Sequence, residues 1–298
     1  MNTTPAMLIH VVAAIVLSPM IPGIINRVKA LFAGRKGRPL FQAYADMAKL
    51  LRKSSVYSRT TTWVFRMSPL VTVSVGLMGI LIVPLGRVPG LLVFPGDMVL
   101  LAYLFGFSRF FMVLGALDTG SAFEGMGSSR EVQFSMLAEP ALLLCLCALS
   151  ALGGKTSINE MFTALQAGTR PVLAAALFIV LLAENARIPF DDPNTHLELT
   201  MVHEVMILDY SGVDLAYMEY GACLKLWVYA SLTASLVVPT GMDGPWGALA
   251  AGIVSLLMVA VAVGVVESVM ARFRLIRIPQ LLVGAAILSL VCLILIIR

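Results

Sequence analysis

The sequence has little charge. Only 13% of its 298 residues are Asp, Glu, Lys or Arg, whereas 59% are apolar. A soluble domain carries about 25% charged residues, which keep its surface in water. A mean hydropathy of +0.92 over the whole chain also excludes a soluble protein with one membrane tail. We therefore exclude a soluble enzyme, expect no nucleic-acid partner, and predict one all-α, polytopic membrane domain over residues 1–298.

Cysteine is scarce as well, and the spacing of the four cysteines excludes a metal site. Cys145, Cys147, Cys223 and Cys292 lie in or beside apolar runs, without a CxxC pair and without nearby histidines. Zinc and iron–sulfur centres need several such ligands close together. We interpret all four as small packing residues, so the chain is expected to bind no metal and no redox cofactor of its own.

Long apolar runs are what the sequence does have. A helix needs about 20 residues to cross the hydrocarbon layer of a bilayer, and eight runs approach this length. The first run is not a cleaved signal peptide, because Arg27 and Lys29 follow it instead of preceding it. Eight spans would place both termini on one side. The predicted spans cover residues 7–26, 69–86, 97–117, 133–152, 171–189, 221–239, 246–268 and 278–297.

The basic residues lie mostly on one side of these predicted spans. Ten of the 21 fall between the first two spans, and others follow the third, fifth and seventh spans. Because Lys and Arg accumulate in cytoplasmic loops, we predict that the long loops are cytoplasmic and that both termini lie outside. The few basic residues of the outer side are Arg87, Lys155, Arg170 and Arg298.

Two predicted cytoplasmic loops are longer than a helix connection needs. Residues 27–68 include GRKGRPLFQAYADMAKLLRK, whose apolar residues recur at helical spacing. This predicts an amphipathic helix at the membrane interface, which serves either docking or lipid anchoring. Residues 190–220 contain seven acidic residues and no Lys or Arg. Since an acidic segment is not attracted to anionic lipid, we expect this loop to dock a soluble partner.

Several charged residues fall inside the predicted spans, where charge is costly and usually marks a pathway. Arg109 and Glu139 lie at similar depths of two antiparallel neighbours, so they are expected to meet; a purely structural ion pair is the alternative. We expect the outer half of every predicted span to be uncharged, with His10 the ionisable group nearest to it. Such a path is a half-channel, from which protons leave sideways into another membrane subunit. Its predicted residues are Arg109, Glu139, Glu184, Lys225 and Glu267.

Several motifs resemble one membrane-protein family. GRKGRPLFQAYADMAKLLRK and AENARIPFDDPNTHLEL, followed by DYSG, are similar to cytoplasmic segments of the complex I subunit 1 family. The resemblance covers the whole chain, including the eight predicted spans. LDTGSAFEGMGSSREVQFSMLAEPALLL and ESVMARFRL resemble the branch formed by the membrane subunits of energy-converting nickel–iron hydrogenases, including formate hydrogenlyase.

This resemblance implies a non-catalytic anchor and coupling subunit in a bacterial or archaeal inner membrane. It would link electron transfer in a peripheral hydrogenase or dehydrogenase arm to ion movement through antiporter-like membrane subunits. The nickel–iron and iron–sulfur centres would belong to the partner chains, and quinone is a further candidate ligand. The motif positions that imply an interface or cavity beside the redox arm are Gln42, Asp46, Lys49, Arg130, Glu131, Arg187, Asp191, Glu198 and Asp209.

The chain departs from the family pattern in the acidic loop. Asn194 and His196 stand where the family usually has acidic residues, and the segment 199–209 is longer and adds His203 and Glu204. A metal site formed by these histidines and Glu204 is disfavoured, because their spacing fits no standard pattern such as HExxH. The effect of these departures on coupling stays open.

Two other functions remain as alternatives. A quinone-site subunit of an NADH-quinone oxidoreductase would belong to the same family. A standalone secondary transporter would need ionisable groups near the midplane that are reachable from both sides, and the uncharged outer half argues against it. The sequence leaves open the electron donor and acceptor, and whether the coupled ion is a proton or a sodium ion.

Overall fold

The computed structural model describes residues 4–162, 169–191, 201–238 and 244–297. The described residues form helices and no β-strand. The helices are α1 Thr4–Leu17, α2 Met20–Phe32, α3 Gln42–Leu51, α4 Trp63–Ile82, α5 Asp97–Asp118, α6 Ala122–Gly153, α7 Ile158–Met161, α8 Arg170–Glu184, α9 His203–Met206, α10 Gly212–Val237, α11 Pro245–Val269, the 3₁₀ turn Leu275–Arg277 and α12 Ile278–Ile297.

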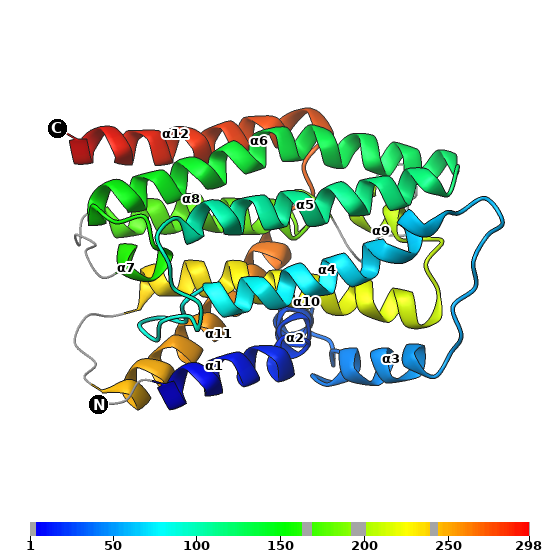
Figure 1. Cartoon of the computed structure of the whole chain (residues 1–298), viewed down its shortest axis with the longest axis horizontal. Helices are drawn as coiled ribbons and strands as arrows, with labels where there is room; N and C mark the ends of the chain where they lie inside the picture. The colour runs from blue at the N-terminus through cyan, green and yellow to red at the C-terminus, as the bar shows by residue number, and fades with distance from the viewer. Residues whose placement is uncertain (1–3, 163–168, 192–200, 239–243, 298) are drawn as a thin grey trace.

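The long helices run roughly parallel or antiparallel in one bundle (Figure 1). Helices α6, α8 and α12 pack together on one side, and α4, α5, α10 and α11 on the other. Helix α10 is central, because every residue from Leu226 to Leu236 is buried. Helix α1 begins and α12 ends at the same end of the bundle, which we call the α7 end, whereas α9 lies at the opposite α9 end (Figure 1).

The chain is a multi-pass membrane protein. Among the described residues, α4, α5, α6, α11 and the segment Leu275–Leu295 are long and apolar enough to cross a membrane. Helices α1 and α2 form a sixth candidate, a pair bent by 58°. Helix α8 has 15 residues and α10 carries many polar side chains. A helix thus lies at each predicted span, but the number eight stays a prediction.

Several helix boundaries differ from those expected. The first predicted span is broken between α1 and α2 at Pro19, which has no backbone N–H to donate and clashes with the preceding turn. Helices α6 and α10 begin at Ala122 and Gly212, well before the predicted residues 133 and 221. An apolar run marks only the part of a helix that meets lipid. The helix continues beyond the run in turns made of polar residues. Much of what was predicted as loop is therefore helix.

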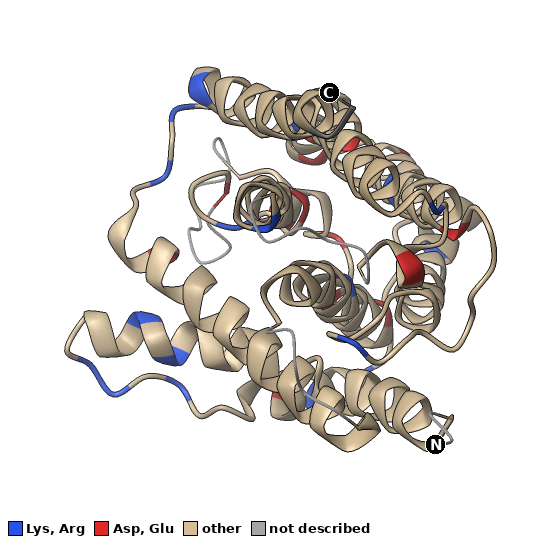
Figure 2. Cartoon of the chain, turned by 90° about the vertical axis from the view of Figure 1, so that its left-hand side faces the viewer, with Lys and Arg blue, Asp and Glu red and all other residues tan. Residues whose placement is uncertain are grey.

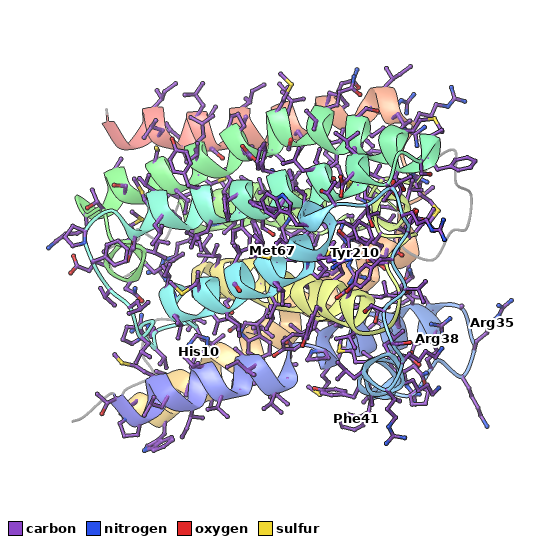
Figure 3. The ribbon with its side chains drawn as sticks, turned by 45° about the vertical axis from the view of Figure 1, so that its right-hand side comes forward. His10, Arg35, Arg38, Phe41, Met67 and Tyr210 are labelled. Carbon is purple, nitrogen blue, oxygen red and sulfur yellow. The ribbon has the colours of Figure 1, made fainter. Side chains whose placement is uncertain are left out.

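The predicted helix in the basic segment is present as α3. None of its residues is fully buried, although Tyr44 donates a hydrogen bond of 2.5 Å to the carbonyl of Val16. In the connection that precedes it, Arg35 and Phe41 point away from the bundle (Figure 3). Helix α3 therefore lies on the surface of the bundle and is attached to α1 through Tyr44.

Glycines allow α4 and α10 to approach closely. A Cβ atom at Gly76 would lie 2.7 Å from the Cβ of Leu224, and one at Gly221 would lie 2.6 Å from the Cγ2 of Thr72. Real Cβ atoms do not approach other atoms so closely. The two glycines therefore set the separation of the helices that carry Thr72 and Lys225.

We expect Gly76→Val to lower the stability of the detergent-solubilised subunit by about 1–3 kcal/mol, because the added methyl groups force α4 away from Leu224. The measurement is a thermal melt of the full-length chain. Gly125→Ala in α6 is the matched control, since a Cβ there meets no atom within 4 Å. A Gly76→Val melt equal to that of the control would contradict the close packing.

Candidate functional site

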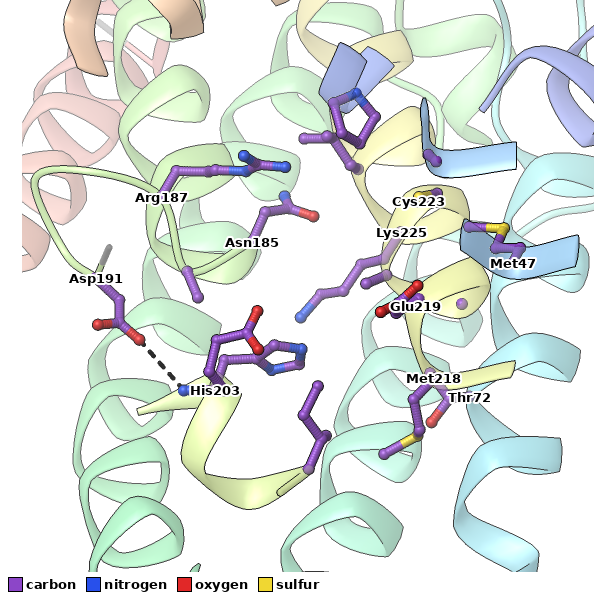
Figure 4. Close-up of a pocket in the computed structure, with 18 of the residues that line it drawn as sticks. Met47, Thr72, Asn185, Arg187, Asp191, His203, Met218, Glu219, Cys223 and Lys225 are labelled. Atoms are coloured by element: carbon purple, nitrogen blue, oxygen red, sulfur yellow. Dashed lines mark hydrogen bonds between the residues drawn. The ribbon is translucent and has the colours of Figure 1, made fainter. Parts of the chain in front are cut away.

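A cavity of about 320 Å³ lies between α2, α3, α5, α8, α9 and α10. Its wall combines residues from the basic segment, the acidic loop and the bundle core. Asn185, His203 and Lys225 direct their side chains into it (Figure 4). Apolar contacts come from Phe105, Met112 and Leu226 among others. The four basic and five acidic lining residues are Arg38, Arg109, Arg187, Lys225, Asp46, Glu184, Asp191, Glu204 and Glu219.

One guanidinium joins this cavity to the flank of the bundle. Arg109 on α5 pairs with Glu184 at the end of α8, with Glu139 in the middle of α6, and with Glu131 at 3.0 Å. Lys225 on α10 pairs with the same Glu184 oxygen at 3.0 Å. We call these five residues the Arg109 cluster. The predicted meeting of Arg109 and Glu139 is confirmed.

The members of the Arg109 cluster differ sharply in exposure. The Glu184 side chain is 1% exposed and that of Arg109 6%, whereas the Glu139 side chain is 45% exposed. Lys225 also lies about 6 Å from the ring centres of Phe105 and Tyr229. The ion pairs thus run from a buried, aromatic-lined position beside the cavity to a carboxylate on the bundle surface.

A second set of ion pairs includes Arg187, three residues after the end of α8. Glu267 of α11, whose side chain is 0% exposed, pairs with Lys29 of α2 at 2.8 Å and with Arg187 at 3.5 Å. We call these three residues the Glu267 cluster. Figure 2, which looks along the bundle, shows acidic and basic positions spread over several helices. Charge therefore ties the helices together at more than one place.

Asp191 is held inside the chain. One of its oxygens accepts hydrogen bonds from the backbone N–H groups of Val202 and His203, at 3.0 and 3.2 Å, and the other pairs with Arg272 at 2.9 Å. The residue is only 3% exposed. It was expected at an interface or cavity beside the redox arm, and it does line the cavity. Its partners also make it the residue that holds α9 against the bundle.

The remaining predicted interface residues are divided between the cavity and other positions. Gln42, Asp46 and Arg187 line the cavity. Lys49 is exposed and lies 3.7 Å from Asp46. Outside the cavity, Arg130 donates a hydrogen bond to the carbonyl of Met201, Glu131 belongs to the Arg109 cluster, and Asp209 is exposed. Glu198, Asn194 and His196 lie outside the described residues.

Some polar residues of the core were missed. Asp97 is fully buried at the α7 end, where it accepts hydrogen bonds from Ser157 and from the N–H of Ile158. It opens a predicted span whose outer half was expected to be uncharged. Glu124 is also buried, and accepts a hydrogen bond from the N–H of Asp209. Both residues stand next to polar connections, where hydropathy gives no signal of burial.

Two tyrosines, Tyr210 and Tyr57, contact α4 and α10 respectively. Tyr210 stacks on Phe65 with ring centres 4.0 Å apart and donates a hydrogen bond to the Phe65 carbonyl. Burial raises the pKa of Tyr210. A hydrogen bond with Asp214, and then burial, raise the pKa of Tyr57. Both phenols stay neutral and act as hydrogen-bond donors near pH 7.

No group of three or more His, Cys, Asp or Glu side chains that could hold a metal ion occurs within the described parts of the chain. The three carboxylates of the Arg109 cluster are each paired with the guanidinium of Arg109. The site is therefore an ionic network beside a polar cavity.

Known proteins share this architecture. The family model described as NADH dehydrogenase matches residues 4–297. The chain is 31% identical over 278 residues to hydrogenase-4 component C of Escherichia coli (strain K12), covering 90% of this chain and 87% of that protein. It is 32% identical over 286 residues to formate hydrogenlyase subunit 4 of the same organism, covering 92% of each.

A solved structure is similar in fold. A chain of the membrane-bound sulfane sulfur reductase, an archaeal respiratory membrane complex, matches with a TM-score of 0.84 and 20% identity. The match covers 99% of this chain and 100% of that one. At this identity, the similarity concerns the arrangement of the helices alone.

We expect Arg109→Gln to destabilise the purified subunit by about 3–5 kcal/mol, because it leaves buried carboxylates without their shared cation. Thermal melting of the full-length chain in detergent measures the effect. Lys155→Gln removes a cation from an exposed pair with Glu160 and should change stability by less than about 1 kcal/mol. Equal melting temperatures for the two variants would refute the structural role of Arg109.

Proposed function

Since the chain belongs to the NADH dehydrogenase family, we propose that it is the membrane subunit that couples a peripheral redox arm to ion translocation in a complex I-like assembly. Its hydrogenase-4 and formate hydrogenlyase relatives favour a hydrogenase-type arm. We further propose eight spans, a bacterial or archaeal inner membrane, and an orientation with the α9 end and α3 in the cytoplasm. The orientation rests on the basic residues between the first two spans.

The observation that carries this proposal is that the Arg109 cluster extends from the cavity to the surface of the bundle. Glu184 lines the cavity, and Glu139, on the same guanidinium, is half exposed on the flank of α6. A carboxylate exposed on the apolar flank of a membrane helix is costly in lipid. A neighbouring membrane subunit that covers Glu139 would remove this cost and receive the proton.

The charge balance of the Arg109 cluster suits a mobile proton. Three carboxylates face two cations, so the cluster is neutral when one carboxylate holds a proton. Buried carboxylates resist ionising together. Arg109 keeps its own proton and only biases which carboxylate holds the shared one. Charge arriving at the cavity can then move the proton from Glu184 towards Glu139.

The flank around Glu139 has the composition of a helix-packing surface. Exposed apolar side chains lie on α5 and α6 on both sides of it, and aromatic residues supply much of the area. We propose that an antiporter-like membrane subunit covers this flank. The exposed residues are Tyr103, Phe107, Phe110, Met136 and Leu143.

The redox arm, with its iron–sulfur and nickel–iron centres, would dock at the α9 end, on the basic segment 27–68 and the acidic segment 190–220. Exposed Lys49 and Asp209 carry opposite charges there. Complementary charges favour a defined register between partners. We propose no step through quinone.

Glu184→Gln should leave redox turnover of the soluble arm largely intact and abolish ion translocation by the whole complex, because an amide cannot release a proton to Arg109's other partners. Glu139→Gln should do the same. The measurement is simultaneous turnover and proton uptake in proteoliposomes. Glu160→Gln, in an exposed ion pair at the α7 end, is the control with normal coupling.

The isolated subunit should conduct no protons in liposomes, since its path ends at the flank. Proton flux through the isolated subunit that Glu184→Gln abolishes would show that the path crosses this chain alone. That result would favour the standalone transporter and contradict the coupling proposal.

Docking is tested by reversing two exposed charges together. Lys49→Glu with Asp209→Lys keeps the net charge and should reduce recovery of the arm's subunits with this chain on affinity purification, most strongly at low salt. Asp191 is unsuitable here, because its reversal would break the contact with Arg272 and release α9. Lys155→Glu at the α7 end is the control. Full recovery of the arm with the double variant would contradict docking at this end.

A further inference from the structure

The short helix α9 presents two ionisable side chains that the coupling path above does not use. His203 and Glu204 both line the cavity, and the His203 side chain extends into it opposite Lys225 (Figure 4). The position of His203 is fixed without its ring: its backbone N–H is held by Asp191, and Asp191 by Arg272. Val205 and Met206, both 0% exposed, supply the packing of α9. The imidazole is therefore not needed to hold the fold.

Acidic side chains continue from His203 across the cavity. Glu204 follows it on α9, and Glu219 of α10 also lines the cavity. Glu219 lies close enough to Glu204 and to Asp46 of α3 to be affected by their charges. Six residues separate Glu219 from Lys225, or about 9 Å along the helix. The charged groups of the wall and the volume of the cavity suit bound water, which can bridge such separations.

We propose that His203 is the group that loads protons into this cavity and, with Glu204 and Glu219, delivers them to Glu184 beside Lys225. This inference deepens the proposed function and rests on it. A ring nitrogen of His203 takes a proton from a hydronium ion at the α9 end, so that an N–H bond forms, an O–H bond breaks and a water molecule is left. The imidazolium then releases a proton to the carboxylate of Glu204 or Glu219, which passes it through water to the Glu184 carboxylate, and the imidazole is regenerated. No electron moves and no other bond changes.

Imidazole is suited to this task, because it is the side chain that gains and loses a proton most readily near neutral pH and has two nitrogens for acceptance and release. The charged groups on the elements around α9 are of both signs. They are Asp191 and Arg272 at its backbone, Glu124 and Arg130 on α6, Arg109 on α5, and Arg38, Asp46, Glu184, Arg187, Glu204, Glu219 and Lys225 around the cavity.

His203→Gln in the intact complex is the test, because glutamine keeps the hydrogen-bonding size of the side chain and cannot carry a proton. We expect proton translocation near pH 7 to fall about tenfold to a hundredfold, with redox turnover and the thermal melt of the subunit unchanged. Added imidazole should restore part of the translocation. Glu204→Gln should give a smaller loss, and Glu160→Gln at the α7 end none.

Two outcomes would overturn the proposal. A His203→Gln complex with the translocation rate and pH profile of the natural chain would show that protons bypass the ring. A loss of translocation together with turnover, without rescue by imidazole, would show that His203 is only structural. Glu184→Gln separates this proposal from the coupling function. If Glu184→Gln abolishes coupling and His203→Gln does not change it, the coupling function stands and His203 has no part in it. An unchanged Glu184→Gln complex with an imidazole-rescued His203→Gln defect would show that His203 handles protons, but it would contradict their delivery to Glu184 and overturn the proposed path.

Discussion

The structure depends on one buried cation. The guanidinium of Arg109 is the shared partner of three carboxylates from two other helices, Glu131 and Glu139 on α6 and Glu184 on α8. Inside an apolar bundle, an ionised group without its partner costs several kcal/mol. Because Lys225 also binds Glu184, the same contacts tie α10 to α8. Helices α5, α6, α8 and α10 therefore keep a fixed relative position wherever these charges stay paired, and the cavity wall is built on that fixed group.

Sequence reasoning could find the pair at the centre of this group but not its full membership. Arg109 and Glu139 were predictable because consecutive spans joined by a short turn are antiparallel neighbours, so depth alone brings the two side chains together. Glu131 lies eight residues before Glu139, or about two helical turns, and so points to the same side of α6. It was assigned elsewhere because the apolar window starts at residue 133. Recognising that the helix begins at Ala122 would have placed Glu131 correctly.

Other features were beyond a single sequence. The pairing of Lys29 with Glu267 joins residues more than 200 positions apart, and depends on the bend at Pro19 that turns α2 towards α11. Hydropathy reports how much apolar surface a segment has, not the direction in which it continues. Asp191 was expected beside the redox arm from its motif position, but the partners that bury it cannot be read from the sequence. Arg272, from beyond α11, pairs with one oxygen, and the N–H groups of Val202 and His203 bind the other.

The end of α8 and the turn that follows it link the two ionic clusters and give the cavity its electrical asymmetry. Glu184 belongs to the Arg109 cluster, which has one more carboxylate than cations, and Arg187 belongs to the Glu267 cluster, which has one more cation than carboxylates. Between them Ala186 has φ +48°, a left-handed conformation that costs a non-glycine residue about 1–2 kcal/mol. This turn sends Glu184 and Arg187 into different clusters, although both line the cavity. Opposite excess charges at so short a separation are felt by both sides, because salt screens over roughly 8 Å and buried groups are screened less. A proton added to or removed from the Arg109 cluster therefore changes the field at Arg187 as well, so both clusters respond to one event in the cavity.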